Sequence, residues 1–555
     1  MASSTRRPCT LFLAVFLAGV AALLVDQSRA ELFTAITHLR SLQHTEAQVA
    51  ANVAHYLHAE QERLDFCREM LGYMQALLGR NEDEGEYEVE EEYDDDDYDD
   101  YDFYSWEDVL RSYLTRMWLA HNWPELASDQ AEENADNGQL LQLPQPQTGN
   151  WPSEEDLSGA AVGLCRLQHT YDLSAEQMVK LRSPSLNVSA HDRREVAQRC
   201  FDSDDVGSAA EWWASSLDTL EEEGDEPSDD RQAILNSMAR ITMRVQDKRP
   251  ALRLLLAYHD GVPLDERAKL VEKVQADARL QYSSVATDAA SFENLCSSSR
   301  SFARNATSST SAGLRCVVLH ITTHPMLVLR PLHVEVLNED PRIGLVYNFL
   351  TKRHARALRK MAEPLLFRAL VFNAVRRQTV SPVRTSKVAW LRDHEVPLVA
   401  QLSSAASAVT GMSFESSEEL QVVNYGVGGH YSPHADYTRQ HEQPSQEEMH
   451  SGQRAATWLM YLSDVHRGGG TVFPDLGLKV EAKEGRALFW LNLLPNPANG
   501  GRFQHNPANR TRSVGNNRTT HGACPVLVGS KWIATKWLHE LGQSRMPYDW
   551  PASVR

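Results

Sequence analysis

Two residues of types that bind metal ions stand two positions apart near the C-terminal end of the chain. His434 and Asp436 lie in the stretch NYGVGGHYSPHADYTRQ, residues 424–440. On a β-strand, side chains two residues apart point to the same face, so both could bind one ion. A chain with 21 histidines is expected to contain about one such His-x-Asp triplet by chance. Taken alone, the triplet is better explained as the polar end of a strand.

A third metal-binding side chain changes that interpretation. His521 begins a predicted strand in TTHGACPVLVGSKW. Two histidines and one carboxylate on one face of a metal, with other positions open, form the site of non-haem Fe(II) oxygenases. Lys531 follows a Val-Gly-Ser turn, and a buried lysine there would bind the far carboxylate of an anionic co-substrate. The alternatives are a loop position for His521 and a solvated hairpin position for Lys531.

The region around these residues has the pattern of an all-β domain. Short apolar runs broken by Gly, Pro, Asn or Asp begin after about residue 292, and one helix-like segment, residues 351–370, precedes most of them. About eight strands after a helix predict a sandwich or jelly roll.

The rest of the chain is predicted to be largely helical. Residues 157–274 read as short helices joined by short turns, which predicts stacked hairpins similar to tetratricopeptide repeats. In them, Trp212 and Trp213 are predicted to pack in the core rather than to contact a ligand. Residues 31–80 carry apolar side chains at alternating three- and four-residue spacing, which predicts a coiled-coil seam or, equally, a helix packed on its own domain.

An acidic run, residues 82–102, carries most of the net charge. It holds 15 carboxylates and no Lys or Arg, and without it the formal net charge of −20 becomes about −5. We predict a disordered, solvated spacer. The alternative is a segment that binds a basic partner through its negative charge. No basic face is evident elsewhere, so we expect no nucleic-acid partner.

Several features predict a secreted or lumenal chain. Two arginines, an apolar run and the small-residue sequence Ser28-Arg29-Ala30 predict a signal peptide over residues 1–30, with an anchor helix as the alternative. No later stretch is apolar enough for a membrane span. Cys296 and Cys316, which flank a Ser-rich loop, are the predicted disulfide. Four N-x-S/T sequons mark candidate glycosylation sites: Asn187, Asn305, Asn509 and Asn517.

Four motifs together resemble the 2-oxoglutarate, Fe(II)-dependent prolyl 4-hydroxylases, most closely the collagen prolyl 4-hydroxylase alpha subunits. They are QVVNYGVGGHYSPHADYTR, ATWLMYLSDVHRGGGTVFP, ALFWLNLL and THGACPVLVGSKWIATKWLHE. ELFTAITHLRSLQHTEAQV and SGAAVGLCRLQHTYDLSAEQM extend the resemblance upstream. The resemblance implies a multidomain α + β chain whose last domain is a double-stranded β-helix. The predicted parts are a signal peptide 1–30, a helical dimerisation region 31–136, a linker 137–156, a helical peptide-binding domain 157–290, a connecting segment 291–415 and a dioxygenase core 416–545.

The resemblance also implies a role for each matching residue. His434, Asp436 and His521 would bind Fe(II), and Lys531 the distal carboxylate of 2-oxoglutarate. Six further residues would line the co-substrate or peptide side of the site, with core packing as the alternative for the aromatic ones. They are Tyr425 and Thr471 in the co-substrate pocket, Tyr431, Arg454 and Trp537 toward peptidyl proline, and His539 near the co-substrate.

The implied reaction is hydroxylation of C4 of peptidyl proline, in which O₂ and 2-oxoglutarate are consumed and succinate and CO₂ are released. Ascorbate would reduce the iron again after unproductive turnovers. The implied partners are protein disulfide isomerase, a second alpha subunit and a collagen-like or other proline-rich polypeptide, and the implied compartment is the lumen of the endoplasmic reticulum. The chain ends PASVR, with no retention tetrapeptide, so a partner would have to retain it.

Four departures from the family pattern qualify these expectations. The acidic run 82–102 interrupts the helical region in which dimer contacts are expected, and it could alter assembly. The stretch CFDSDDVGSAAEWWASSL lacks the tyrosines of the family's peptide groove, although Trp212 and Trp213 could replace them. Cys524 lacks the partner that the family would give it, which leaves Cys67, an external thiol or a free buried thiol. The loop 495–519 before His521 would gate substrate or be an inert insertion. Two rival functions remain: the same chemistry on another secreted protein, and a non-catalytic subunit that binds proline-rich peptides.

Overall fold

The computed structural model describes residues 154–180, 188–223, 229–283, 287–298, 315–372, 378–379, 381–439, 442, 446–494, 513–543 and 550. The predicted signal peptide, coiled coil and acidic run lie outside these ranges, as do the sequons at Asn187, Asn305 and Asn509. The predicted linker, 137–156, lies outside them up to residue 153, and its last three residues are helical instead. Asn517 lies within them and is exposed. Within the described ranges, no helix is both long and apolar enough to cross a membrane.

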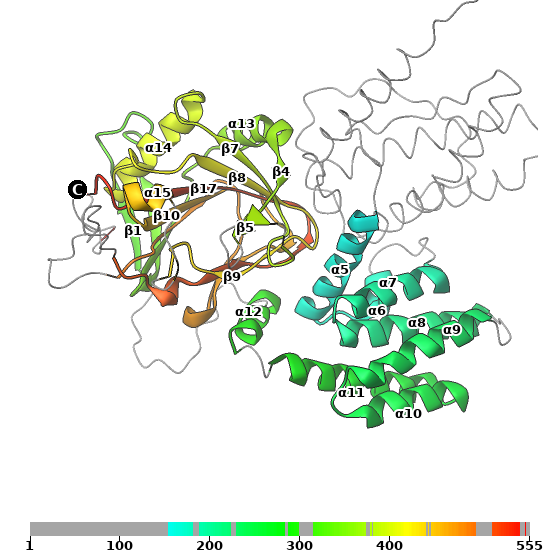
Figure 1. Cartoon of the computed structure of the whole chain (residues 1–555). Coiled ribbons are helices and arrows are strands. Elements are labelled where there is room, and N and C mark those ends of the chain that lie inside the picture. The colour runs from blue at the N-terminus through cyan, green and yellow to red at the C-terminus, as the bar shows by residue number, and fades with distance from the viewer. Residues whose placement is uncertain are drawn as a thin grey trace, which may run out of the picture.

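The helical region, residues 154–297, is formed by short helices, as the sequence predicts (Figure 1). Hydrogen-bonding side chains define several of their starts: Ser189 forms a capping box with Asp192 at α7, and Asp247 caps α10. The helices are α5 (Glu154–Tyr171), α6 (Ala175–Lys180), α7 (Ala190–Asp202), α8 (Val206–Glu223), α9 (Asp229–Ala239), the 3-10 helix η2 (Arg240–Met243), α10 (Lys248–His259), α11 (Leu264–Ser283) and α12 (Thr287–Ser297).

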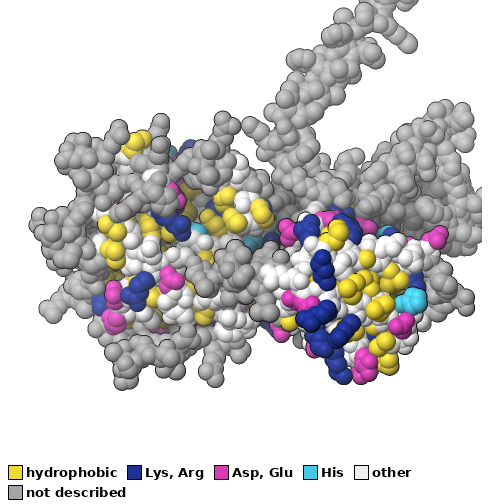
Figure 2. Space-filling view, turned by 60° about the horizontal axis from the view of Figure 1, so that its bottom comes forward, with side chains coloured by type: hydrophobic (Ala, Val, Ile, Leu, Met, Phe, Trp, Pro, Cys, Tyr) yellow, Lys and Arg dark blue, Asp and Glu magenta, His cyan; other side chains and the backbone are white. Residues whose placement is uncertain are grey.

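Helix α8 is the centre of this region and packs against α7, α9 and α11. Its Trp212 and Trp213 are fully buried, which confirms the predicted core packing. The Trp212 indole N–H donates to Gln168 Oε1 at 2.9 Å. Because neither ring reaches the surface, the two tryptophans cannot replace the tyrosines of a peptide groove, and that expectation is wrong. Apolar side chains do reach the surface elsewhere on these helices (Figure 2), among them Leu252 and Leu256 of α10.

The β region, residues 315–543, is built from antiparallel strands. One sheet has nine strands in the order β1-β2-β3-β14-β10-β17-β8-β7-β4, and a second has the order β13-β12-β15-β9. The nine strands are β1 (Arg315–Leu319), β2 (Leu332–Glu339), β3 (Arg342–Val346), β4 (Phe367–Arg368), β7 (Lys387–Leu391), β8 (Leu420–Tyr425), β10 (Arg454–Tyr461), β14 (Ala487–Leu491) and β17 (Lys531–His539). The four are β9 (Tyr431–His434), β12 (Thr471–Phe473), β13 (Leu478–Val480) and β15 (His521–Ala523). Two small ribbons pair β5 (Val371–Phe372) with β6 (Gln378–Thr379) and β11 (Arg467–Gly468) with β16 (Val526–Val528).

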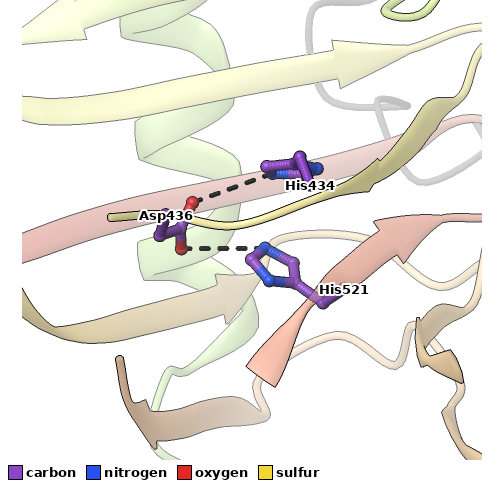
Figure 3. Close-up of side chains that lie close together, drawn as sticks. All are labelled: His434, Asp436 and His521. Atoms are coloured by element: carbon purple, nitrogen blue, oxygen red, sulfur yellow. Dashed lines mark ion pairs between the residues drawn. The ribbon is translucent and has the colours of Figure 1, made fainter. Parts of the chain in front are cut away.

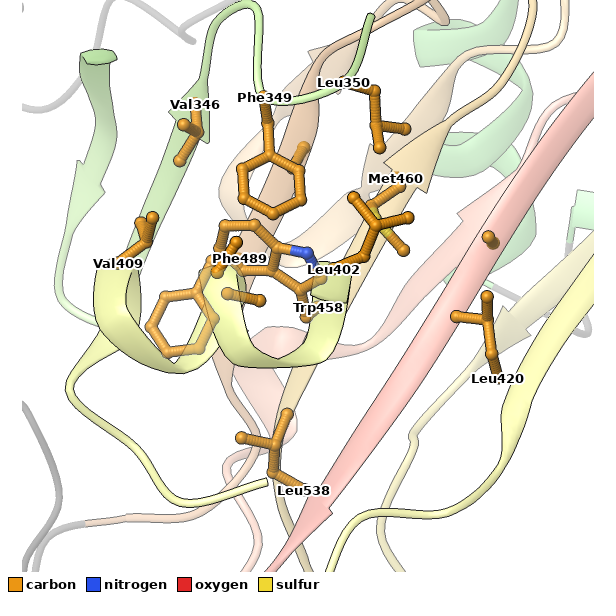
Figure 4. Packing of buried hydrophobic residues seen from close by; sticks show 14 of the residues in the cluster. Val346, Phe349, Leu350, Leu402, Val409, Leu420, Trp458, Met460, Phe489 and Leu538 are labelled. Carbon is orange, nitrogen blue, oxygen red and sulfur yellow. The ribbon is translucent and has the colours of Figure 1, made fainter. Parts of the chain in front are cut away.

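Two cores hold the β region together, one on each face of the nine-stranded sheet. Alternation along β10 shows this directly, because Trp458 and Met460 belong to one core and Leu459 and Tyr461 to the other. The first core lies between the sheet and the helices α13 (Lys352–Ala362) and α14 (Pro397–Thr410), as the packing around Trp458 shows (Figure 4). The second core lies between the two sheets. A third helix, α15 (Gln446–Ser451), precedes β10.

The structure corrects one prediction for this region and adds one helix. The helix-like segment 351–370 is helical only to Ala362, apart from one 3-10 turn, and enters β4 at Phe367. Helix α14 was not predicted, although Pro397 in its first turn and Gly411 at its left-handed end are usual helix boundary signals.

The predicted Cys296–Cys316 disulfide is wrong. Cys296 pairs with Cys524, and Cys316 is free and exposed. The reason is topological: Cys316 lies on β1, an edge strand of the nine-stranded sheet, whereas α12 packs against the other sheet. Closeness in sequence therefore does not bring the two thiols together. The same pairing gives Cys524 a partner that the sequence did not identify. A second disulfide, Cys165–Cys200, joins α5 to α7.

Candidate metal and co-substrate site

Two short strands of the smaller sheet bring the predicted metal ligands together. His434 is the last residue of β9, His521 is the first of β15, and the antiparallel pairing places them directly opposite each other. Asp436 follows β9 after one residue and turns back toward both rings (Figure 3). One ligand atom from each of the three residues lies within 4.8 Å of the others. The three predicted side chains therefore converge.

Both imidazoles direct the same nitrogen toward the aspartate. His434 Nε2 lies 3.7 Å from Asp436 Oδ1, and His521 Nε2 lies 3.6 Å from Asp436 Oδ2. Each Nδ1 lies about 3 Å from the backbone carbonyl oxygen two residues earlier in the chain, Ser432 for His434 and Thr519 for His521. An N–H donated to a carbonyl fixes the tautomer and leaves Nε2 as a lone pair, which is how metal-binding histidines are usually oriented.

The electrostatics of the cluster favour the protonation states that a metal requires. Burial lowers the pKa of His434, and the neighbouring His521 lowers it further, so the ring is neutral near pH 7. Burial alone would raise the pKa of Asp436, but His521, His434 and Arg454 outweigh it and hold the pKa below its usual range. Asp436 also accepts a hydrogen bond from the Thr457 hydroxyl at 2.7 Å. Two imidazoles and a carboxylate fit Fe(II), leaving positions open for other ligands.

The predicted lysine is buried between the two sheets. Lys531 begins β17 opposite Tyr425 of β8 and is 1 % exposed. Its Nζ lies 3.4 Å from Thr471 Oγ1 and 5.5 Å from the centre of the Tyr425 ring. No carboxylate of the described residues lies within ion-pair distance of it, and burial lowers its pKa to about 7. A buried amine with hydroxyl and aromatic neighbours is suited to bind an anion.

The remaining predicted residues form two groups. The Tyr431 ring stacks on the His434 ring at a centroid distance of 3.6 Å, and the Arg384 guanidinium lies over Tyr431 at 4.8 Å. Arg454 lies over the Trp537 ring at 4.0 Å. Arg454 donates to both oxygens of Glu418, at 2.5 and 2.9 Å, and His539 Nε2 lies 3.1 Å from Glu418 Oε1. The structure thus places His539 against Glu418 and the Gly452 carbonyl.

Three residues of this site were not predicted. Glu418 is one of several similar acidic residues in the stretch ESSEEL, and only the fold buries it. Arg384 lies in a loop without a motif. Thr457 did carry a signal, because it is a hydroxyl residue in the middle of the apolar run AATWLMYL, where a polar side chain needs a partner.

Comparisons with known proteins show to which sequences this chain is similar. The description "2OG-Fe(II) oxygenase superfamily" matches residues 420–539, and "Prolyl 4-Hydroxylase alpha-subunit, N-terminal region" matches residues 35–181. The chain is 31 % identical to prolyl 4-hydroxylase subunit alpha-2 of Caenorhabditis elegans, with 94 % of each chain covered. It is 32 % identical to subunit alpha-1 of Gallus gallus, covering 71 % of this chain and 78 % of that one. It is 29 % identical to subunit alpha-1 of Homo sapiens, covering 94 % of this chain and 96 % of that one.

A solved structure with similarity to this chain is that of a viral collagen prolyl hydroxylase from Paramecium Bursaria Chlorella virus-1 in complex with 2OG. It is 22 % identical and covers 36 % of this chain and 96 % of its own, with a TM-score of 0.25. A TM-score of that size does not establish a common fold over the whole chain.

Proposed function

The chain belongs to the prolyl 4-hydroxylase alpha-subunit family, and we propose that its β region hydroxylates peptidyl proline at C4 with residues His434, Asp436, His521 and Lys531. The observation that carries the assignment is the convergence of the three metal ligands, whose ligand atoms lie within 4.8 Å of one another, together with the burial of Lys531. A polar strand end would not require two imidazoles with fixed tautomers or a buried lysine.

Each of these residues has a distinct task in the proposed reaction. When bound, Fe(II) with 2-oxoglutarate and O₂ supplies the oxidising power that converts proline to 4-hydroxyproline while 2-oxoglutarate becomes succinate and CO₂. His434, Asp436 and His521 would hold the ion and leave positions on it open for the reactants. Lys531 pairs with the distal carboxylate of 2-oxoglutarate, and the Thr471 hydroxyl and the Tyr425 ring line the same pocket. That carboxylate supplies the anionic partner that Lys531 lacks among the described residues.

The peptide side is proposed to consist of Tyr431, Arg454 and Trp537. Tyr431 covers the outer face of the His434 ring, so a prolyl ring held against it would lie beside the metal. The flat face that Arg454 forms over Trp537 is held rigid by Glu418. His539 supports this face through the same carboxylate and is therefore proposed as a positioning residue.

The remaining proposals extend the family assignment to cofactor, partners and compartment. We propose ascorbate as the reductant that restores Fe(II) after unproductive turnovers. We propose protein disulfide isomerase as the beta subunit, a second alpha subunit as a further partner, and the lumen of the endoplasmic reticulum as the compartment. A collagen-like polypeptide is the proposed substrate, and the burial of Trp212 and Trp213 makes the proline itself better supported than the collagen repeat.

The test is succinate release by the full chain co-expressed with protein disulfide isomerase. The reactions contain iron and 2-oxoglutarate, with either a Pro-Pro-Gly repeat peptide or a proline-rich peptide without the glycine repeat. We expect peptide-dependent succinate release and 4-hydroxyproline in the product, and the His434→Ala variant should show neither. Release with only the second peptide would exclude the collagen-like substrate. No release with folded, iron-loaded protein on either peptide would refute the assignment.

The same variant distinguishes the enzyme from a non-catalytic subunit that holds proline-rich peptides. A binding subunit would retain its peptide affinity and its biological effect in the His434→Ala variant. The enzyme would retain peptide affinity but lose product, because the imidazole acts on the metal and not on the peptide.

A further inference from the structure

The strand that carries His521 is covered on its outer face by a helix of the helical region. Along β15, His521 and Ala523 face the interior between the sheets, so Gly522 and Cys524 face outward. A Cβ atom on Gly522 would lie 2.7 Å from the Phe292 ring of α12. Cys524 is bonded to Cys296 of the same helix. Phe292, Cys296 and Cys524 form one buried cluster with Leu295 and Val472, so the contact excludes water.

Helix α12 is itself fixed to the smaller sheet. Lys479 of β13 is buried, and its Nζ donates to the carbonyls of Cys296 at 3.1 Å and Ser298 at 2.7 Å. A cation at the last carbonyls of a helix satisfies acceptors that have no partner within the helix, and it also interacts favourably with the helix dipole. Figure 1 shows α12 between the β region and the other helices, next to β9.

Helix α5 holds the segments next to both histidine-bearing strands. The Tyr171 hydroxyl donates to the carbonyl of Pro525, four residues after His521, at 2.5 Å. Arg166 donates to the carbonyl of Gly428 at 2.8 Å, in the turn that leads into β9. Gly428 has a backbone φ of +74°, and a Cβ atom at this position would lie 3.2 Å from the Cα atom of Gly163. Helices α5 and α12 also contact each other through His169 and Glu293, at 3.2 Å.

The sheet alone gives the metal ligands little support. Strand β15 has three residues and β9 has four, and β9 is the last strand of its sheet, with a single bridge, Tyr431 to Arg384, on its outer edge. Only two residue pairs join the two strands, with an irregular register between them. Typical strands are longer, about five to six residues. Ligands of a functional site must be held within about 0.5 Å of their working geometry. The constraint that short strands do not provide has to come from the elements packed against them.

We propose that α5 and α12 form a brace that positions the metal ligands, with Phe292, Cys296 and Arg166 as positioning residues for the ion. The helical region is then a structural part of the metal site as well as the proposed peptide-binding domain. The inference rests on the proposed function, because it takes the cluster of His434, Asp436 and His521 to be the metal site.

The test measures metal affinity in full-length protein without iron, by titration with Co(II) and detection of its absorption bands. The Cys296→Ser/Cys524→Ser variant is compared with Tyr258→Phe, which removes two hydrogen bonds of α10, a helix of the helical region that is not part of the brace. Circular dichroism identifies a temperature at which both variants are folded. We expect the first variant to bind Co(II) about 10-fold more weakly than the wild type, as is typical for loss of an outer-shell support. The control should stay within about twofold.

A second variant keeps both disulfides, so the proposal can be tested even if the first fails to fold. Phe292→Ala should weaken Co(II) binding in the same direction, and Phe292→Leu, which refills most of the space, should restore part of the affinity. A second readout is the amount of succinate formed per 4-hydroxyproline, which measures how tightly the two products are coupled. This ratio should rise in Cys296→Ser/Cys524→Ser and in Phe292→Ala, and it should not rise in the control. Wild-type affinity and coupling in Phe292→Ala would overturn the proposal. Failure of the wild type to bind Co(II) would instead refute the metal site itself.

Discussion

The β region contains two buried clusters of a carboxylate and histidine, and they differ in how the carboxylate is used. Asp436 faces His434 and His521 at 3.7 and 3.6 Å, distances longer than a hydrogen bond. Glu418 bonds directly to Arg454 at 2.5 Å and to His539 at 3.1 Å. The first cluster leaves space between its ligand atoms for an ion. In the second cluster, the charge of the carboxylate is already neutralised by the side chains bonded to it.

For the same reason, the pKa values of His434 and His539 are shifted in opposite directions. Burial and a neighbouring imidazole lower the pKa of His434, which keeps it neutral. Burial also opposes charge on His539, but the hydrogen bond to Glu418 outweighs it and raises the pKa. A neutral imidazole can bind a metal ion, and a protonated one cannot. The two clusters thus show that residue types alone do not define a metal site, since distances and protonation states separate an open site from a closed one.

The largest effect expected from this comparison is that of Asp436→Asn, which removes one charge and keeps the shape. Metal sites with several protein ligands bind with about 10–16 kcal/mol, so loss of one charged ligand should weaken binding by roughly 1,000-fold. Co(II) titration of the protein without iron measures this directly, and succinate release should fall in parallel. Binding within tenfold of the wild type would mean that the aspartate is not a ligand.

Glu418→Gln removes the same charge from the closed cluster and should act on stability instead. It leaves the partly buried guanidinium of Arg454 without its ionic partner, which costs about 3 kcal/mol in the free energy of unfolding, the low end for a buried ion pair. Metal affinity should stay within about threefold, because Glu418 is not among the residues that converge on the proposed metal site. Urea unfolding of the two variants side by side measures the contrast, and a large loss of metal affinity in Glu418→Gln would contradict it.

The contrast should also appear in the pH dependence of stability. Burial would raise the pKa of Glu418, but Arg454 and His539 lower it to about 2. Since an unfolded glutamate titrates at about 4.3, the stabilisation is present above that pH and is lost as the pH falls toward 2. The wild type should therefore lose stability faster than Glu418→Gln over this interval, as measured by urea unfolding at several pH values.

The sequence predicted the members of the open cluster better than those of the closed one. Strand alternation placed His434 and Asp436 on one face, and the motif order gave His521 and Lys531 at the right distance along the chain. Glu418 could not be predicted, because its burial depends on β17 and β10 packing beside the segment that carries it. The disulfide was missed for the same kind of reason, since Cys296 and Cys524 are 228 residues apart and only the packing of α12 on β15 brings them together.

Lys531→Met should have a smaller effect than Asp436→Asn or Glu418→Gln. The quantity that it should change is KM for 2-oxoglutarate, not metal affinity or stability. Removing the amine that pairs with the distal carboxylate should raise KM for 2-oxoglutarate by about 100-fold, as for a buried charged hydrogen bond. Co(II) affinity should be unchanged, which separates the co-substrate pocket from the metal ligands. An unchanged KM would place the co-substrate carboxylate elsewhere.

The lysine also predicts a pH dependence of stability in the absence of co-substrate. Burial lowers its pKa to about 7, whereas an unfolded lysine titrates at about 10.4. Between these values the unfolded state binds more protons, so this group makes the folded protein more stable as the pH rises. Thermal unfolding from pH 7 to 10 should show this rise in the wild type and a smaller one in Lys531→Met. Saturating 2-oxoglutarate should reduce the difference, because the carboxylate stabilises the charged amine.

The smallest effect is expected at Thr457, which connects the open cluster to the strand beneath it. Its hydroxyl accepts a hydrogen bond from Asn492 Nδ2 at 2.9 Å and donates one to Asp436 Oδ2 at 2.7 Å, so the amide fixes the direction in which the hydroxyl points. Thr457→Val keeps the volume and removes both bonds, and it should weaken Co(II) binding by about 10-fold. Thr457→Ser, which retains the hydroxyl, should recover most of that loss. Equal affinities for the valine and serine variants would show that Asp436 is oriented by packing alone, and the open cluster would then owe its geometry to the strands and the helices that brace them.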